Sequence, residues 1–129
     1  MTQPFIVKAT SKIHPGKAEA YAPRAREICQ LVEENEPRVL AFHIYVNQDQ
    51  SSESVIQIHP DAESMQYHLR LLGDKVRETF EYTDFEALEV FGSPNDALMG
   101  WLERATEGIP FTVHPVHWGG FTRLWTPTP

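Results

Sequence analysis

The sequence predicts an α+β fold of the ferredoxin-like type, with the order strand, helix, strand, strand, helix, strand. Three observations indicate it: an alternating run near the N-terminus, a long stripe of apolar residues at helical spacing after Pro15-Gly16-Lys17, and two further alternating runs followed by a second helical stripe. With 129 residues and 41% hydrophobic residues, the chain can bury one core. We therefore expect an antiparallel sheet that carries both helices on the same face.

The first strand and the first helix follow from local patterns. Residues 5–12 alternate with a period of two, which is typical of a half-buried strand. Pro15 suits a first helical turn, where its missing N–H has no partner to lose. The helix should end before Pro37, because a residue that precedes proline is pushed out of the α region. Pro23 lies inside the stripe and should either kink the helix or mark the start of its regular part.

Residues 39–47 and 54–59 are two alternating runs, joined by the polar stretch 48–53, and they predict a hairpin. A symmetric loop gives the register Tyr45 opposite Val55, His43 opposite Gln57 and Ala41 opposite His59. On that register one face of the hairpin is apolar, and the other holds polar side chains that either line a pocket or form a polar layer in a dimer interface. These side chains are His43, Tyr45, Gln57 and His59.

The second helix carries the residue of greatest chemical interest. Asp61 is placed to cap this helix, and His68 falls on its apolar stripe, so the imidazole should point inward. Gly73 is expected to break the run, with 75–79 adding a further turn. Residues 85–91 predict the fourth strand.

Residues 93–129 form a predicted C-terminal extension that packs on the same domain as residues 1–92. Ser93-Pro94-Asn95-Asp96 has the pattern of a helix start, with Pro94 at the first helical position. The stripe that follows consists of Leu98, Trp101, Leu102 and Ala105. It should be buried, because each large apolar side chain contributes about 1.5–3 kcal/mol on burial. Residues 111–123 predict one more strand, interrupted by Pro115.

Charge and composition exclude several classes of partner. The net charge of −7 repels phosphate backbones, so nucleic acid is not an expected partner. The sequence contains neither a signal-peptide pattern nor 18 consecutive apolar residues, which predicts a cytoplasmic protein with no membrane partner. Cys29 is the only cysteine, cannot form an intrachain disulfide, and is expected to be a small buried hydrophobe.

Three of these motifs, in this order, resemble the antibiotic biosynthesis monooxygenase (ABM) domain family over roughly residues 6–92. They are Pro15-Gly16-Lys17 at the helix entry, Asn35-Glu36-Pro37 before the second strand, and residues 61–69 on the second helix. The resemblance implies a homodimer, the dimeric α+β barrel, in which two ferredoxin-like sheets pair face to face and each protomer has a pocket between sheet and helices. Some members of the family oxidise quinols or aromatic polyketides with molecular oxygen and no cofactor, and others degrade haem.

The chain also departs from the family. Many relatives have a glutamate and an aromatic residue two apart at the end of the third strand, where this chain has Gln57 and His59. The haem-degrading branch uses an asparagine on the first strand and a tryptophan on the second helix, whereas this chain offers Lys8 or Thr10, and Tyr67. The resemblance therefore disfavours haem degradation and implies that no cofactor is bound.

His68 is the candidate catalytic residue. An inward imidazole above a pocket can take a phenolic proton near neutral pH, and the alternative is a core histidine held by one hydrogen bond. The leading hypothesis is a cofactor-independent monooxygenase acting on a small quinol or phenolic substrate. The alternative is a non-catalytic dimeric module that binds a small aromatic or apolar ligand. The candidate substrate-binding residues are His43, Tyr45, Gln57, His59, Tyr67 and Trp118.

No metal site is expected. His114 and His117 point to opposite faces of an extended strand, and Pro115 prevents a helix that would bring them together. Glu33, Glu34 and Glu36 are expected to be solvated residues of a helix face.

Overall fold

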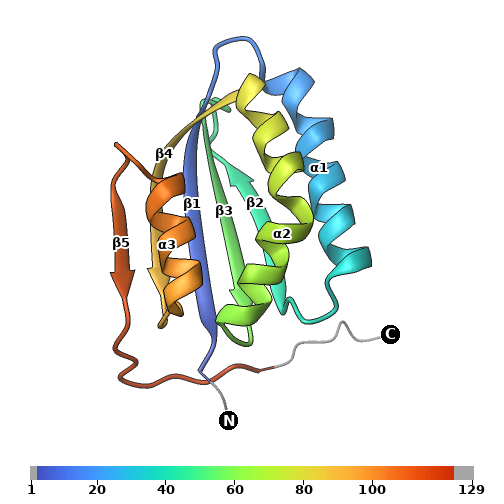
Figure 1. The fold of residues 1–129 in the computed structure, drawn as a ribbon. Coiled ribbons are helices and arrows are strands. Elements are labelled where there is room, and N and C mark those ends of the chain that lie inside the picture. Colours follow the sequence, from blue (N-terminus) through green and yellow to red (C-terminus); the bar gives the residue numbers. More distant parts are fainter. Residues whose placement is uncertain (1–2, 124–129) are drawn as a thin grey trace.

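In the computed structural model, which describes residues 3–123, a five-stranded sheet is covered on one face by three helices (Figure 1). The elements are β1 (Phe5–Ile13), α1 (Ala18–Asn35), β2 (Ala41–Val46), β3 (Ser52–His59), α2 (Ala62–Glu78), the 3₁₀ turn η1 (Thr79–Glu81), β4 (Thr83–Phe91), α3 (Asp96–Ala105) and β5 (Phe111–His114). The strand order is β2-β3-β1-β4-β5. The predicted α+β, ferredoxin-like fold is confirmed. The sheet is mixed rather than antiparallel, because β5 runs parallel to β4.

The register of the β2–β3 hairpin differs from the predicted one by one residue. His43 lies opposite Ile56 and Tyr45 opposite Ser54, so the predicted pairing was wrong. The cause is the loop, which closes where Asn47 N–H donates to Ser52 O over 3.1 Å. Ser52 and the residue after it therefore belong to β3, and not to the loop.

This shift separates the four predicted polar residues of the hairpin. Gln57 and His59 lie on the sheet face that the helices cover, with Phe42 opposite Gln57. His43 and Tyr45 lie on the other face, which we call the open face. Besides these two residues the open face carries Ile6, Lys8, Ile56, Ile58 and Phe91. The polar layer expected from the sequence is absent from the hairpin as the structure describes it.

The core lies between the helices and the covered face of the sheet. One cluster joins four sheet residues to α2 and α3, and its buried members are Phe5, Val7, Met65, Leu88, Val90, Leu98 and Leu102. The helix of the predicted extension is thus packed against the sheet through Leu98 and Leu102. This helix begins at Asp96, and the side chain of Asn95 caps it by accepting from Leu98 N–H over 2.9 Å. Pro94 lies before the cap, so its predicted place inside the first turn was wrong.

The Asp61 cap of the second helix is confirmed, but the predicted break at Gly73 and the predicted place of Pro15 were wrong. α2 is capped by Asp61, whose Oδ1 accepts from Ser64 N–H over 2.9 Å, and it passes through Gly73 without a break. Glycine inside a helix is less favourable than alanine by about 1 kcal/mol. The helix continues through Gly73 because residues on both sides of it pack against the rest of the protein. α1 begins at Ala18, after a turn in which Gly16 has φ +78°, so Pro15 is not in its first turn.

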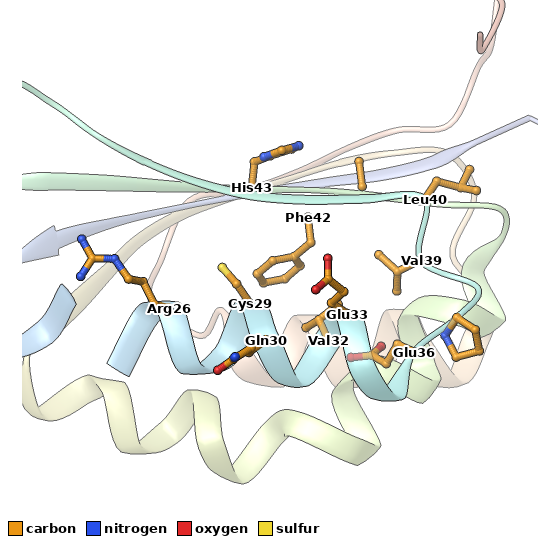
Figure 2. Close-up of a pocket in the computed structure, with 12 residues that line it drawn as sticks. Arg26, Cys29, Gln30, Val32, Glu33, Glu36, Val39, Leu40, Phe42 and His43 are labelled. Atoms are coloured by element: carbon orange, nitrogen blue, oxygen red, sulfur yellow. The ribbon is translucent and has the colours of Figure 1, made fainter. Parts of the chain in front are cut away.

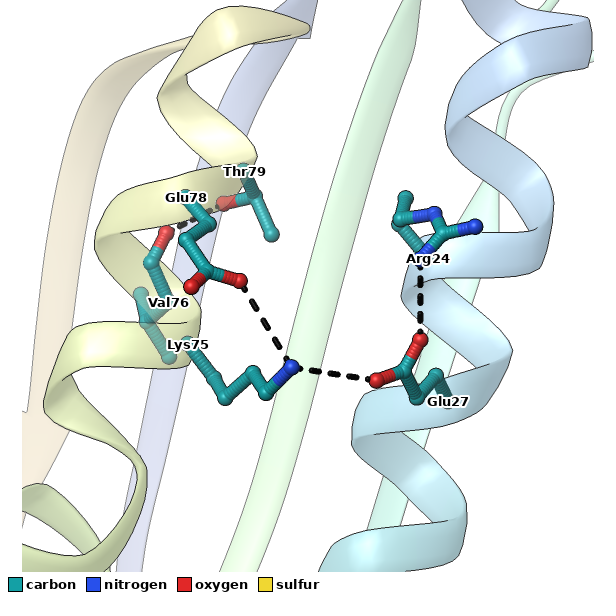
Figure 3. A network of polar contacts seen from close by, with 6 residues as sticks. All are labelled: Arg24, Glu27, Lys75, Val76, Glu78 and Thr79. Carbon is teal, nitrogen blue, oxygen red and sulfur yellow. Dashed lines mark hydrogen bonds and ion pairs between the residues drawn. The ribbon is translucent and has the colours of Figure 1, made fainter.

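Helices α1 and α2 are linked by ion pairs on the surface (Figure 3). Lys75 Nζ lies 3.2 Å from Glu27 Oε1 and 3.7 Å from Glu78 Oε2, and Arg24 Nη1 lies 3.1 Å from Glu27 Oε2. Exposed pairs of this kind contribute about 0–1 kcal/mol each. They help to fix the orientation of the two helices that cover the candidate site.

After β5, residues 115–123 form an arm without helix or strand that crosses the end of the sheet toward the N-terminus (Figure 1). The arm exposes Val116, Trp118 and Phe121. The last six residues of the predicted extension, 124–129, lie outside the described residues. None of the helices between residues 3 and 123 is long and apolar enough to cross a membrane.

Candidate functional site

A cluster of buried polar side chains lies between α2 and the covered face of the sheet. We call it the interior cluster, and it consists of Glu36, Gln57, His59, Ser64 and His68. Gln57 and His59 come from β3, Ser64 and His68 from α2, and Glu36 from the residue that ends α1. The structure therefore brings together three of the predicted site residues, Gln57, His59 and His68.

His68 is bonded to a buried carboxylate that the sequence analysis missed. Its Nδ1 lies 2.8 Å from Glu36 Oε2, and the two side chains are 3% and 1% exposed. The bond engages Nδ1, so Nε2 is the ring nitrogen that Glu36 leaves free. Glu36 Oε1 is buried and has no hydrogen-bond partner within residues 3–123. The arrangement is an acid–base pair in which each side chain fixes the position of the other.

The expectation that Glu36 is solvated was wrong. Glu36 is the C-cap of α1, and its N–H still donates to Val32 O over 2.9 Å. The side chain therefore leaves the helix at its last turn and continues under α2, whereas Glu33 and Glu34, earlier on the same helix, are exposed. A signal was available in the sequence: a carboxylate between a helix end and a proline occupies a fixed position rather than a free helix face.

His59 is fully buried and forms two hydrogen bonds. Its Nε2 lies 2.9 Å from Gln57 Oε1 and its Nδ1 lies 2.7 Å from Ser64 Oγ. The Gln57 oxygen can only accept, so Nε2 carries the hydrogen and the Ser64 hydroxyl donates to Nδ1. Burial, and secondarily the neighbouring His68, lowers the pKa of His59 to about 4. His59 is therefore neutral at pH 7, with its ring centre 6.0 Å from that of His68.

An open groove of about 790 Å³ runs between α1 and β2 next to the interior cluster (Figure 2). We call it the α1–β2 groove. Its lining includes Glu36 and Phe42, and the Phe42 ring centre lies 5.7 Å from that of His68. Figure 2 shows Phe42 pointing toward α1 and His43 pointing to the other side of β2. Glu36 thus connects the groove with His68, which does not line the groove itself.

A smaller cavity of about 240 Å³ shares Arg26 and Cys29 with this groove and holds a second buried carboxyl group. We call it the Tyr21–Glu53 pocket. The Tyr21 hydroxyl donates to Glu53 Oε2, and both residues are buried. Burial raises the pKa of the Glu53 carboxyl, and the bond from Tyr21 partly opposes that rise. Burial also raises the pKa of the Tyr21 hydroxyl and of the Cys29 thiol, which is only half-buried.

The other predicted binding residues lie away from the interior cluster. His43 and the 64%-exposed Tyr45 are neighbours on the open face, with ring centres 6.2 Å apart. Tyr67 is 46% exposed on α2, and Trp118 is 97% exposed on the arm. In the part of the chain that the structure describes, no three His, Cys, Asp or Glu side chains are arranged to hold a metal ion.

No protein-family model and no curated protein sequence matches the chain. Among solved structures, MupZ from Pseudomonas fluorescens superposes with a TM-score of 0.73 at 15% identity, over 95% of this chain and 96% of that one. A protein named antibiotic biosynthesis monooxygenase gives a TM-score of 0.60 at 20% identity, over 70% of this chain and 99% of that one. A provisionally named antibiotic biosynthesis monooxygenase from Chloroflexus aurantiacus gives 0.57 at 12% identity, over 68% and 90% of the two chains.

These identities are low, so the superpositions concern the fold and carry no residue role across. The monooxygenases cover about two thirds of the chain, whereas the likeness to MupZ extends over nearly all of it. The chain has the fold of the antibiotic biosynthesis monooxygenase domains, as the resemblance of its sequence motifs implied.

Proposed function

We propose that the protein is a cofactor-independent monooxygenase that oxidises a small phenol or quinol, with the Glu36–His68 pair as its base. The observation that carries the proposal is the 2.8 Å bond between a buried imidazole and a buried carboxylate, next to an open groove. Buried, mutually bonded acid–base pairs beside a groove are candidates for proton transfer. The names of the structural neighbours support oxidative chemistry on the same fold.

In the proposed reaction, the pair takes the proton of the phenolic hydroxyl. A substrate in the α1–β2 groove meets Glu36 first, so the carboxylate takes the proton while His68 Nδ1 holds it in place through Oε2. The resulting phenolate is electron-rich enough to pass an electron to molecular oxygen. His59, whose ring centre lies 6.0 Å from that of His68, is neutral and adds no positive charge beside the pair.

The overall reaction balances without an external reductant. A phenol with a hydrogen on its para carbon and one molecule of oxygen give a para-quinone and one molecule of water. One oxygen atom becomes the second carbonyl group, and the other leaves as water with the hydroxyl hydrogen and the para hydrogen. The ring supplies the four electrons. The apolar side chains of Val32, Val39 and Phe42 line the groove and would keep water from the reacting pair.

Oxygen uptake by metal-free protein with a panel of small phenols that carry a hydrogen on the para carbon tests this proposal. We expect His68→Gln and Glu36→Gln each to lower uptake by about 10²–10⁴-fold, the range typical of a lost general base. Tyr67→Phe, one position away on the exposed side of α2, is the matched control and should leave uptake unchanged. Thermal unfolding of each variant shows whether the fold persists. Uptake that is unchanged in a folded His68→Gln variant would overturn the role of the pair.

One observation favours a second function, a non-catalytic module that binds a small aromatic or apolar ligand. His68 lines neither the α1–β2 groove nor the neighbouring cavities described here, so its imidazole has no direct access to a ligand there in this conformation. In this case 2,6-dimethylphenol would bind in the groove and shift the NMR signals of Phe42, yet neither it nor any other phenol of the panel would cause oxygen uptake. Uptake above the protein-free rate would exclude the binding module.

We further propose that the protein is a homodimer that pairs through the open face. Ile6, Ile56, Ile58 and Phe91 are only partly covered there, and packing a second sheet on them would bury this apolar surface. Light scattering at micromolar concentration should give twice the chain mass of 14.8 kDa. A mass of one chain would refute the dimer.

A further inference from the structure

We propose that the Tyr21–Glu53 pocket is a second ligand site, in which the Glu53 carboxyl group donates a hydrogen bond to the carbonyl oxygen of a small, uncharged, apolar molecule. The proposed oxidation uses neither residue, so this inference does not depend on it. The pocket is bounded by α1 on one side and by β1, β2 and β3 on the other.

The lining of the pocket selects for apolar ligands of limited size. Six of the lining residues are aliphatic, namely Ile13, Ala18, Ala22, Ala25, Ile44 and Val46. Burying a charged ligand group against such walls is costly, so the ligand should be uncharged. The cavity of about 240 Å³ is smaller than the ~300–1,000 Å³ typical of sites for drug-sized ligands. A single ring or a short chain is the size that fits.

One oxygen of Glu53 is available to such a ligand. Oε2 already accepts from Tyr21. Oε1 of Glu53 has no hydrogen-bond partner among residues 3–123. Among these residues only the Oε1 atom of Glu36 is both unpartnered and fully buried, so the Oε1 atom of Glu53 is not fully buried. Since Glu53 lines the pocket and its Oε2 is bonded to Tyr21, Oε1 is the oxygen left for a ligand there.

The environment of Glu53 makes Oε1 a donor. No ion pair joins Glu53 to a lysine or arginine in the described part of the chain, and the surroundings of the carboxyl are largely apolar. Burial of the carboxyl group raises its pKa and favours its protonated form, although the bond from Tyr21 partly opposes that rise. Because Tyr21 donates to Oε2, the proton resides on Oε1. A carbonyl oxygen is the neutral acceptor that complements it, whereas the cation Arg26, which also lines the pocket, opposes an ammonium ligand.

The titratable groups that face Glu53 all come from α1. They are Tyr21, Cys29 and Arg26, while the lining residues of β1 and β2 are apolar. Burial raises the pKa of the Tyr21 hydroxyl and of the Cys29 thiol, so both stay protonated in the acidic and neutral range, and arginine stays charged. Loss of the Glu53 proton is therefore the change at this site as the pH rises through the raised pKa of its carboxyl group.

Binding of cyclohexanone, followed by NMR of protein with a ¹³C-labelled glutamate carboxyl group, tests the proposal. We expect the wild-type affinity to fall at least tenfold between pH 4 and pH 8, as Oε1 loses its proton. Glu53→Gln keeps a donor at every pH and should bind with an affinity that does not change with pH. Glu34→Gln, an exposed glutamate of α1 that lines neither the groove nor the pocket, is the matched control and should behave as wild type.

Two outcomes would overturn the inference. Wild-type affinity for cyclohexanone that is the same at pH 4 and pH 8 would show that Glu53 does not donate, and this arm needs no variant that could fail to fold. Absence of any shift of the Glu53 carboxyl signal at saturating cyclohexanone would show that the pocket is not a site. His68→Gln should leave the binding intact, so failure of this inference is distinguishable from failure of the proposed oxidation.

Discussion

Protonation of His59 should make the fold sensitive to acid. The histidine is fully buried, and its pKa lies at about 4 instead of the ordinary 6.5. A pKa that is lowered in the folded state contributes stability above pH 6.5, and this contribution is lost as the pH falls toward 4. The gap between 6.5 and about 4, at ~1.36 kcal/mol for each pKa unit, corresponds to about 3 kcal/mol of unfolding free energy.

Urea unfolding at a series of pH values measures this contribution. Other groups titrate in the same range, so the quantity of interest is the difference between wild type and His59→Gln, a variant that keeps a polar side chain but cannot gain a proton. Between pH 7 and pH 4 the wild type should lose about 3 kcal/mol more than the variant. The ¹H–¹⁵N signals of the His59 ring should stay those of a neutral imidazole down to about pH 4.

The comparison has a matched control in the exposed His117 on the arm. His117→Gln should follow the wild-type curve, because this side chain is exposed to water in the folded protein as it is in the unfolded chain. If wild type and His59→Gln lose the same free energy between pH 7 and pH 4, the burial argument for His59 is wrong.

Three further predictions concern stability. Leu98→Ala leaves a cavity in the core under α3 and should lower the unfolding free energy by about 2–5 kcal/mol, whereas an unchanged urea midpoint would mean that α3 is not part of the core. Gly92 has φ +126° and an added Cβ would lie 2.9 Å from Phe5 Cδ2, so Gly92→Ala should destabilise the protein by about 1–3 kcal/mol. Gly73 lies within a helix and an added Cβ would meet open space, so Gly73→Ala should stabilise the protein by about 0.5–1 kcal/mol. Equal shifts of the melting temperature in the two variants would contradict this expectation. Because burial raises the pKa of Glu53 above 4.5, the wild type should lose stability relative to Glu53→Gln as the pH rises through that raised pKa, and a gain in the same range would show that the sign is wrong.

The order of the elements could be predicted because it depends on local patterns. Alternation and helical spacing identify strands and helices wherever one face is apolar, and the inward direction of His68 follows from the same spacing. The hairpin register could not be obtained in this way. Ser52 and Glu53 are polar and look like loop residues, and assigning them to the loop changes the pairing by one residue and exchanges the two faces.

The two buried carboxyl groups were missed for a related reason. A glutamate at a helix end or beside a loop is usually exposed, and sequence alone does not show what lies above it. Glu36 is buried because α2 brings His68 over it, and Glu53 because α1 brings Tyr21 over it. In both cases the bonded partner lies 32 positions away in the sequence, and helical or strand periodicity predicts no contact at such a separation.

The short strand β5 forms one edge of the sheet and affects the tendency of that edge to aggregate. Outer strands present unpaired backbone groups that can pair with another chain and start aggregation. β5 has only four residues and is followed directly by Pro115, which has no N–H to offer, so it is a poor template for further strands. Without β5 the nine residues of β4 would form that edge. β5 thus lowers the risk that another chain adds a strand at this edge. β2 forms the opposite edge, and with six residues and no proline it has no such protection.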